Sequence, residues 1–94
     1  MMLDAKNVEA VIGRICGDLG LIYAGWHSIS PGVIGSEPCP SICFVVGPGP
    51  LPASDRSRMR FAQVGGTRTI VTDHHGQVIA EYADITKATL LSHE

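Results

Sequence analysis

Residues 58–82, R-M-R-F-A-Q-V-G-G-T-R-T-I-V-T-D-H-H-G-Q-V-I-A-E-Y, carry the pattern that decides the fold. Gly65 and Gly66 separate an extended run that ends at Val64 from another that starts at Thr67. Two adjacent glycines are the signal of a two-residue hairpin turn, because both central residues of that turn need positive φ. We therefore predict an antiparallel hairpin around these glycines.

A second turn follows at 73–76, where Asp-His-His-Gly returns the chain into the run 77–83. Gly76 suits the left-handed position that closes a three-residue hairpin loop. Together the two turns predict a three-stranded antiparallel meander over 58–83. The rest of the chain is expected to pack around this meander.

The N-terminal segment predicts a helix over 4–19, because apolar residues recur there at helical spacing. The residues of this stripe are Val8, Val11, Ile12, Ile15 and Leu19. Gly17 or Gly20 can end the helix. Gly13 lies inside the pattern at a cost of about 1 kcal/mol relative to alanine, which indicates close approach of a neighbouring element.

Two further strands are predicted, at 21–30 and at 41–46. The first is rich in aromatic and branched residues, and Gly25 interrupts it, which indicates a bulge. The second, S-I-C-F-V-V, is a continuous apolar run typical of a buried strand. All six prolines fall within 31–52. The parts of that region outside the second strand are therefore expected to be loops, with 47–52 as an extended polyproline-like connection.

Trp26 and His27 are neighbours on the first of these strands, so their side chains point to opposite faces. Trp26 is the only tryptophan. It is either a core anchor or a partner-facing contact residue, and we favour the core. His27 is then expected to face solvent.

These elements predict an α+β fold, with an N-terminal helix packed on an antiparallel sheet of about four or five strands in a single domain, 1–94. A short C-terminal helix over 85–92, capped by Asp84, is an optional last element. In an alternative, 21–30 forms a loop or an extension of the helix, and the sheet has four strands. The sheet edges can pair between copies, so a homodimer is a further option.

The composition fits one packed domain, since 45% of the 94 residues are hydrophobic and 17% are charged. The net charge of -2 gives no general attraction to nucleic acid or to an anionic membrane. The sequence has no apolar run near the roughly 20 residues of a membrane helix, and it shows no signal segment. We therefore expect a cytoplasmic protein without membrane contact. Three cysteines, Cys16, Cys39 and Cys43, suit a reducing compartment.

The cationic residues are concentrated, because four of the seven lie within 56–68. Arg56, Arg58 and Arg60 alternate, so on a strand they project from one face. Arg68 follows the glycine turn. This face is either ordinary solvated surface or a recognition patch for carboxylates or phosphates.

The two-residue turn also fixes a pairing register for the first hairpin. Its opposed pairs are Arg58 with Asp73, Arg60 with Val71, and Arg68 with Gln63. In this register Met59 and Phe61 face the helix, and the arginines face solvent.

The stretch 71–75, V-T-D-H-H, resembles the D-H-H signature of the DHH phosphoesterases, in which the aspartate and histidines belong to a manganese cluster. The aspartate-rich motifs that this family also needs are absent here. We therefore interpret the stretch as a hairpin turn, and we assign no metal ligand and no cofactor. Cys39 and Cys43 lie on an extended segment, which keeps their sulfurs apart.

For function we predict a small non-enzymatic interaction protein, an inhibitor or adaptor that sterically blocks a larger cytoplasmic partner with an acidic surface. Phage and mobile-element inhibitors are proteins of this kind. No catalytic motif is recognised. The predicted partner-binding residues are Arg56, Arg58, Arg60, Arg68, Trp26, Pro48 and Leu51. Two alternatives are nucleic-acid binding through the arginines, and a metal-binding protein or metalloenzyme that uses Asp73, His74 and His75.

Overall fold

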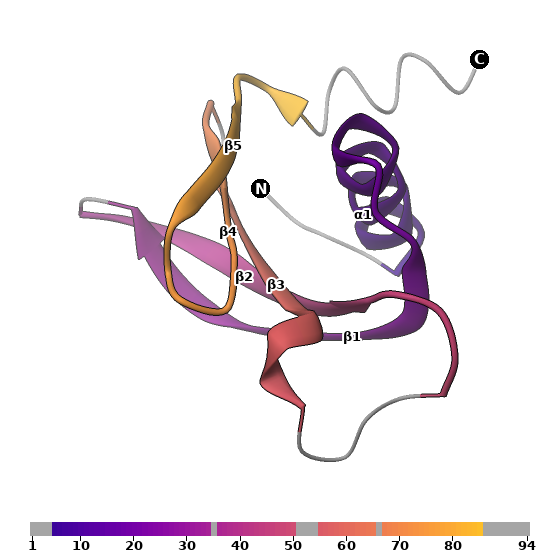
Figure 1. Ribbon diagram of the computed structural model, residues 1–94. Helices are drawn as coiled ribbons and strands as arrows, with labels where there is room; N and C mark the ends of the chain where they lie inside the picture. The colour runs from indigo at the N-terminus through magenta and orange to yellow at the C-terminus, as the bar shows by residue number, and fades with distance from the viewer. Residues whose placement is uncertain (1–4, 35, 51–54, 66, 86–94) are drawn as a thin grey trace.

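The described part of the chain folds into one helix and a five-stranded sheet. The computed structural model describes residues 5–34, 36–50, 55–65 and 67–85. The elements are α1 (Ala5–Leu19), β1 (Tyr23–Ile34), β2 (Glu37–Val46), the 3₁₀ turn η1 (Arg56–Arg58), β3 (Met59–Val64), β4 (Thr69–Thr72) and β5 (Val78–Tyr82). The strands are antiparallel in the order β1-β2-β3-β4-β5, and α1 lies against one face of the sheet (Figure 1). The α+β prediction is confirmed.

The apolar stripe of α1 is buried as predicted. Val8, Val11, Ile12 and Ile15 are at most 1% exposed. The helix ends at Gly20, whose φ of 67° is left-handed, and the Leu21 N–H donates to the Cys16 carbonyl at 2.9 Å.

The prediction for Gly13 is wrong. A Cβ atom built at this residue meets nothing within 4 Å outside the helix's own backbone. Gly13 is exposed on α1, so no neighbouring element requires a glycine there.

β1 and β2 are longer than predicted, because both strands run through prolines that were expected to lie in loops. Pro31 lies opposite Pro40. The Gly47 N–H donates to the Ile22 carbonyl at 2.7 Å, so alternation along β2 turns the odd-numbered residues toward β1 and the even-numbered ones away. Pro40 thus has its nitrogen turned away from β1, and Pro31 has its nitrogen turned toward the open edge. Neither proline removes a hydrogen bond between the two strands.

The bulge at Gly25 is confirmed. The pairing register of β1 shifts between Tyr23 and His27, and Gly25 has a φ of 90°. The expected polyproline-like course is wrong for residues 47–50, because Gly47 and Gly49 have positive φ values of 105° and 90°. The remaining two residues of that prediction lie outside the described part of the chain.

The first hairpin has a different register from the predicted one. Val64 lies opposite Thr69, and the Gly65 N–H donates to the Arg68 carbonyl at 2.8 Å. The connection is therefore longer than two residues, and Gln63 pairs with Ile70 rather than with Arg68.

The face assignment of β3 is also wrong. Ala62 lies opposite Ile42 on β2 and Val71 on β4, and all three side chains are fully buried in the core with α1. Met59 and Phe61 alternate with Ala62, so they point to the other face and are half-buried. The small side chain of Ala62 fits beneath the helix, because Phe44 already fills the layer between the helix and the sheet.

The second turn has the predicted three-residue loop. The Asp73 N–H donates to the Gln77 carbonyl at 3.0 Å, and the Gly76 N–H donates to the Asp73 carbonyl at 3.1 Å. Gly76 has a φ of 81°. The Asp73 carboxylate accepts hydrogen bonds from the N–H groups of Gln77 and His75. These bonds, the one from Gln77 first, lower the pKa of Asp73.

We expect the stabilisation from Asp73 to depend on pH. A carboxyl with a lowered pKa stabilises the fold above its unfolded pKa of about 3.9, and this contribution is lost as pH falls through the folded pKa. Asp73→Ala should therefore lower the urea midpoint at pH 7, and the difference from the unmodified chain should shrink at pH 3. Asp73→Asn, which keeps a neutral acceptor, is the control. An equal difference at both pH values would show that the charge is not what stabilises the turn.

Ile85 is 2% exposed and joins the core. The rest of the predicted helix over 85–92 lies outside the described residues. Among the described residues, none of the helical structure is long and apolar enough to cross a membrane.

Candidate functional site

Arg58 holds the loop after β2 and is not a free recognition group. Its guanidinium donates to three backbone carbonyls, those of Val46 at 2.7 Å, Gly47 at 3.0 Å and Pro50 at 3.0 Å. A guanidinium presents its donors in a fixed planar fork, which suits several carbonyls on one curved segment. The guanidinium of Arg58 thus has a structural role, and its role in partner binding stays a prediction.

The predicted arginine stripe is not formed. Arg56 and Arg58 belong to η1, and only Arg60 lies on β3. Arg60 is opposite Phe44, on the α1 side of the sheet, and its Nη1 donates to the carbonyls of Ser57 and Met59, both at 2.8 Å. Strand alternation therefore cannot bring these three side chains onto one solvent face.

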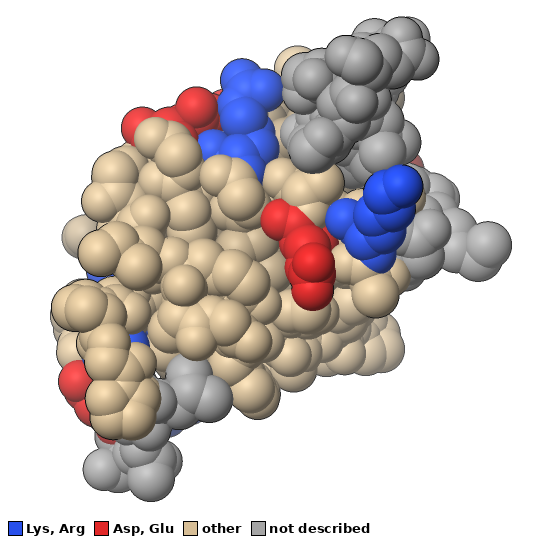
Figure 2. All heavy atoms as spheres, turned by 90° about the vertical axis from the view of Figure 1, so that its right-hand side faces the viewer, with Lys and Arg blue, Asp and Glu red and all other residues tan. Residues whose placement is uncertain are grey.

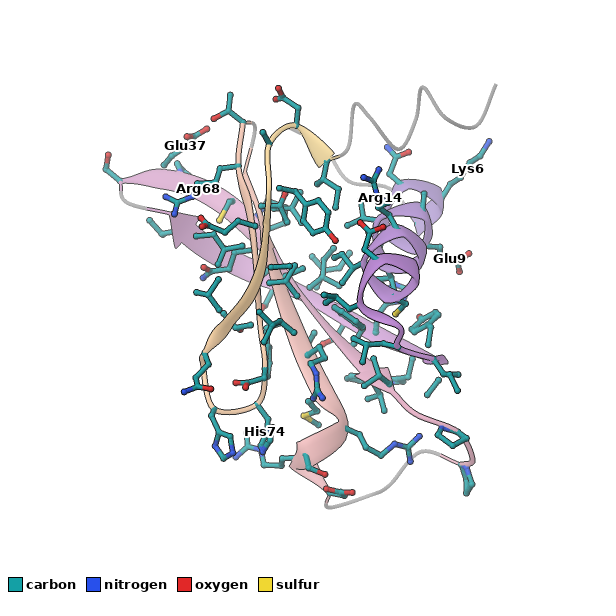
Figure 3. The ribbon with its side chains drawn as sticks, turned by 45° about the horizontal axis from the view of Figure 1, so that its top comes forward. Lys6, Glu9, Arg14, Glu37, Arg68 and His74 are labelled. Atoms are coloured by element: carbon teal, nitrogen blue, oxygen red, sulfur yellow. The ribbon has the colours of Figure 1, made fainter. Side chains whose placement is uncertain are left out.

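Arg68 is separate from the others as well. It forms an ion pair with Glu81 on β5, with Nε at 2.8 Å from Oε1. Figure 3 shows Arg68 and His74 at opposite ends of the sheet. On the α1 side of the molecule, cationic and anionic side chains are interspersed in the upper part, and a broad area below them carries no charge (Figure 2). The four arginines thus do not make one basic patch.

Exposed apolar side chains gather at the two edges of the sheet instead. Among the described residues, the exposed large hydrophobic side chains are Ile22 (59%), Trp26 (38%), Ile29 (46%), Val33 (55%), Val78 (58%) and Ile79 (37%). Four of them lie on β1 or directly before it, and two lie on β5. The central strands β2, β3 and β4 contribute none of them.

β1 is an edge strand with free backbone groups. Beyond the bulge, the backbone N–H and carbonyl groups of the even-numbered residues point toward β2. The N–H and carbonyl groups of the odd-numbered residues therefore point outward. These outward residues are His27, Ile29, Pro31 and Val33. We call this row, together with the side chains of Trp26, Ile29 and Val33, the β1 edge. Pro31 is the one member without an N–H to offer.

The β1 edge lacks one common protection of an exposed edge, the charged side chain. Natural edges are commonly blunted by charged side chains, and residues 23–34 contain no Asp, Glu, Lys or Arg. The β1–β2 ribbon reaches away from α1 to its tip (Figure 1), so Ile29 and Val33 lie on the α1 side of the sheet and yet stay exposed. Only the bulge at Gly25 and the missing N–H of Pro31 interrupt the edge.

Trp26 and His27 are arranged opposite to the prediction. Trp26 is 38% exposed, so it is not a core anchor. His27 lies opposite Phe44 and is half-buried, with its Nδ1 2.8 Å from the Tyr23 hydroxyl across the bulge. Burial raises the pKa of Tyr23, which keeps its phenol neutral at pH 7. This contact spans the bulge, and Trp26 beside it lies at the surface.

The opposite edge, β5, is better protected. It is five residues long, its register shifts between Val71 and Thr72 on the neighbouring strand, and Glu81 within it carries a charge paired with Arg68. A short, bulged and charged edge is a poor template for a further strand. β1 is therefore the stronger candidate for a contact surface.

The cysteines and histidines do not assemble into a metal site among the described residues, where no group of three or more His, Cys, Asp or Glu side chains could hold an ion. Cys39 lines an open pocket of about 340 Å³ between Pro31 and Pro40, and it is 4% exposed. Burial, and then the charge of Glu37, raises the pKa of its thiol. A thiol with a raised pKa is a weak nucleophile at neutral pH.

Comparisons of the chain with family models, with curated proteins and with solved structures found no match.

The predicted contact residues lie in different parts of the structure. Trp26 lies in the β1 edge. Pro48 is exposed on the loop held by Arg58, and Leu51 lies outside the described residues. Sequence reasoning missed Val33 because 31–34 was taken for a loop, and it placed Ile29 on the strand 21–30 without identifying that strand as an exposed edge. A usable signal was present, since the run from Leu19 to Ser36 has no charged residue.

Proposed function

We propose that this chain is a non-enzymatic protein-interaction module, and that its contact surface is the β1 edge. The observation that carries the proposal is the gathering of exposed apolar side chains along an uncharged edge strand with a free backbone row. A row of alternating N–H and carbonyl groups is satisfied best by the extended backbone of another polypeptide. The partner class is therefore a protein strand.

Strand addition would supply both affinity and selectivity. Backbone hydrogen bonds from His27, Ile29 and Val33 give a sequence-independent attraction. The side chains of Trp26, Ile29 and Val33 add apolar contact on both faces of the edge, with about 25 cal/mol gained per Å² buried. A strand held in this way is no longer available to other proteins, which is how such a module would act as a steric inhibitor or adaptor.

Nucleic-acid binding has less support. Arg58, Arg60 and Arg68 already donate to backbone carbonyls or to Glu81. The chain has a net charge of -2, which opposes a general attraction to phosphates. Binding of this kind would need these guanidinium groups to leave their present partners.

A photo-crosslinker at position 29 is expected to form covalent adducts with another polypeptide in the native cell, because this position lies at the centre of the β1 edge. The same group at position 79, also an exposed isoleucine on an edge strand, is the matched control. Val33→Lys should reduce the adducts from position 29. Adducts that form equally from both positions, or from neither, would contradict the proposal. Recovery of nucleic acid alone would favour the arginine alternative.

A further inference from the structure

We propose that the β1 edge binds the β1 edge of a second copy of this chain, antiparallel, with a two-fold axis at Ser30. The sheet would then continue from one copy into the other. This inference rests on the proposed function, because it names the partner of the same edge.

The backbone row has the symmetry that such a pair needs. The outward residues His27, Ile29, Pro31 and Val33 are placed symmetrically about Ser30. In an antiparallel pair centred there, His27 lies opposite Val33 of the second copy, and Ile29 lies opposite its Pro31. Every outward residue beyond the bulge meets another outward residue. Pro31 has no N–H, and its ring would face the Ile29 carbonyl of the second copy. Each copy therefore loses one hydrogen bond and the ladder widens there, while the two His27–Val33 pairs keep their hydrogen bonds.

The side chains also favour self-pairing. On the α1 side, Ile29 and Val33 are 46% and 55% exposed, and pairing would place them against Pro31 and His27 of the second copy. On the other face, the residues that meet are Ser28, Ser30 and Gly32, which are small enough for close approach of two strands. A second copy would therefore cover Ile29 and Val33, two of the exposed apolar side chains of this edge.

Charge argues for a second copy over an acidic partner. The chain has a net charge of -2, so two copies repel each other wherever their anionic side chains meet. Residues 23–34 include no Asp, Glu, Lys or Arg, so pairing of two copies along this segment brings no like charges together. An acidic partner would need cations at the contact. The nearest arginines on the sheet belong to β3 and to the residue before β4, beyond β2.

The test is a disulfide across the two-fold axis. In the proposed pair the two Ser30 residues form a non-hydrogen-bonded pair with Cα atoms about 4.5 Å apart, which is within the range of a disulfide. The background is Cys43→Ser, because Cys43 is the half-buried thiol and the other two are buried. Ser30→Cys in this background is expected to give a covalent dimer under mild oxidation. Ser28→Cys, on the same face two residues away, is the control and should give little.

Light scattering during gel filtration gives the second readout. The unmodified chain should be a dimer at tens of micromolar, Ile29→Lys should be a monomer with an unchanged thermal midpoint, and Ile79→Lys should remain a dimer. A monomeric unmodified chain, or crosslinking of Ser28→Cys equal to that of Ser30→Cys, would overturn self-pairing. In that case adducts from position 29 with a different protein would still support the proposed function. The absence of such adducts would contradict the proposed function as well as self-pairing.

Discussion

Phe44→Ala is expected to lower the free energy of unfolding by about 3–5 kcal/mol, because truncation of a buried phenylalanine loses its burial and leaves a cavity. Phe44 is 0% exposed and fills the layer between α1 and the sheet. A domain of this size has a total stability of only about 5–14 kcal/mol at the usual 0.05–0.15 kcal/mol per residue. The variant should therefore unfold at a much lower urea concentration, which a urea titration followed by circular dichroism would measure.

Phe61→Ala is the matched control for Phe44→Ala. Phe61 lies on the opposite face of the sheet and is half-buried, so its truncation should cost clearly less. The comparison also tests the face assignment of β3, for which the sequence predicted the reverse. A cost for Phe61→Ala equal to or above that for Phe44→Ala would mean that β3 presents Phe61 to the core.

Arg58→Ala is expected to destabilise the fold by about 2 kcal/mol, since hydrogen bonds to a charged group contribute roughly 1.5–3 kcal/mol and the carbonyls stay partly accessible to water. The variant leaves the carbonyls of Val46, Gly47 and Pro50 without the guanidinium. Arg58→Lys should recover only part of the loss, because one ammonium cannot reproduce the planar fork. Thermal unfolding would show the effect as a lower midpoint, by about 4–8 °C per kcal/mol for a domain of this size.

Arg56→Ala provides the control for Arg58→Ala, because Arg56 is an exposed neighbour in the same turn. Its effect should stay within about 0.5 kcal/mol, as is usual for surface positions. If Arg58→Ala left stability unchanged and removed the position-29 adducts, the arginine would be a recognition residue, as the alternating sequence pattern suggested.

The helix and the core under it could be predicted because their pattern is local and redundant. Four buried residues of α1 repeat one spacing, and a glycine with positive φ follows the last turn. The three-residue loop at 73–77 was predictable for the same reason, since Asp73 and Gly76 each meet a specific geometric demand of the turn. Such signals need no knowledge of distant contacts.

The register of the first hairpin could not be read from its glycines. Two glycines permit several connection lengths, and the choice depends on which residues of β3 fit beneath α1. Ala62 and Val64 fit there beside Phe44, so Phe61 is on the other face. This packing involves three separate elements, and no local sequence pattern predicts it.

The second half of the candidate site, from Pro31 onward, was missed because proline was taken as a sign of a loop. Pro31 is tolerated in β1 because its nitrogen faces the open edge, and Pro40 is tolerated because the β2–β3 ladder stops at Ser41 and Gln63. The two prolines therefore limit where neighbouring strands can pair, but they do not end β1 or β2. Their positions relative to β3 could be known only once the strand pairing was known.

The strand order has a consequence for how fast the chain folds. Every pair of neighbouring strands is also consecutive along the chain, so each ladder can form by closing a short or moderate loop. Docking of α1 is the exception, because it brings Asp18 to the Tyr82 hydroxyl at 2.9 Å across 64 positions. Since long-range contacts slow folding, the rate-limiting step is expected to be the closure of the helix onto an already formed meander.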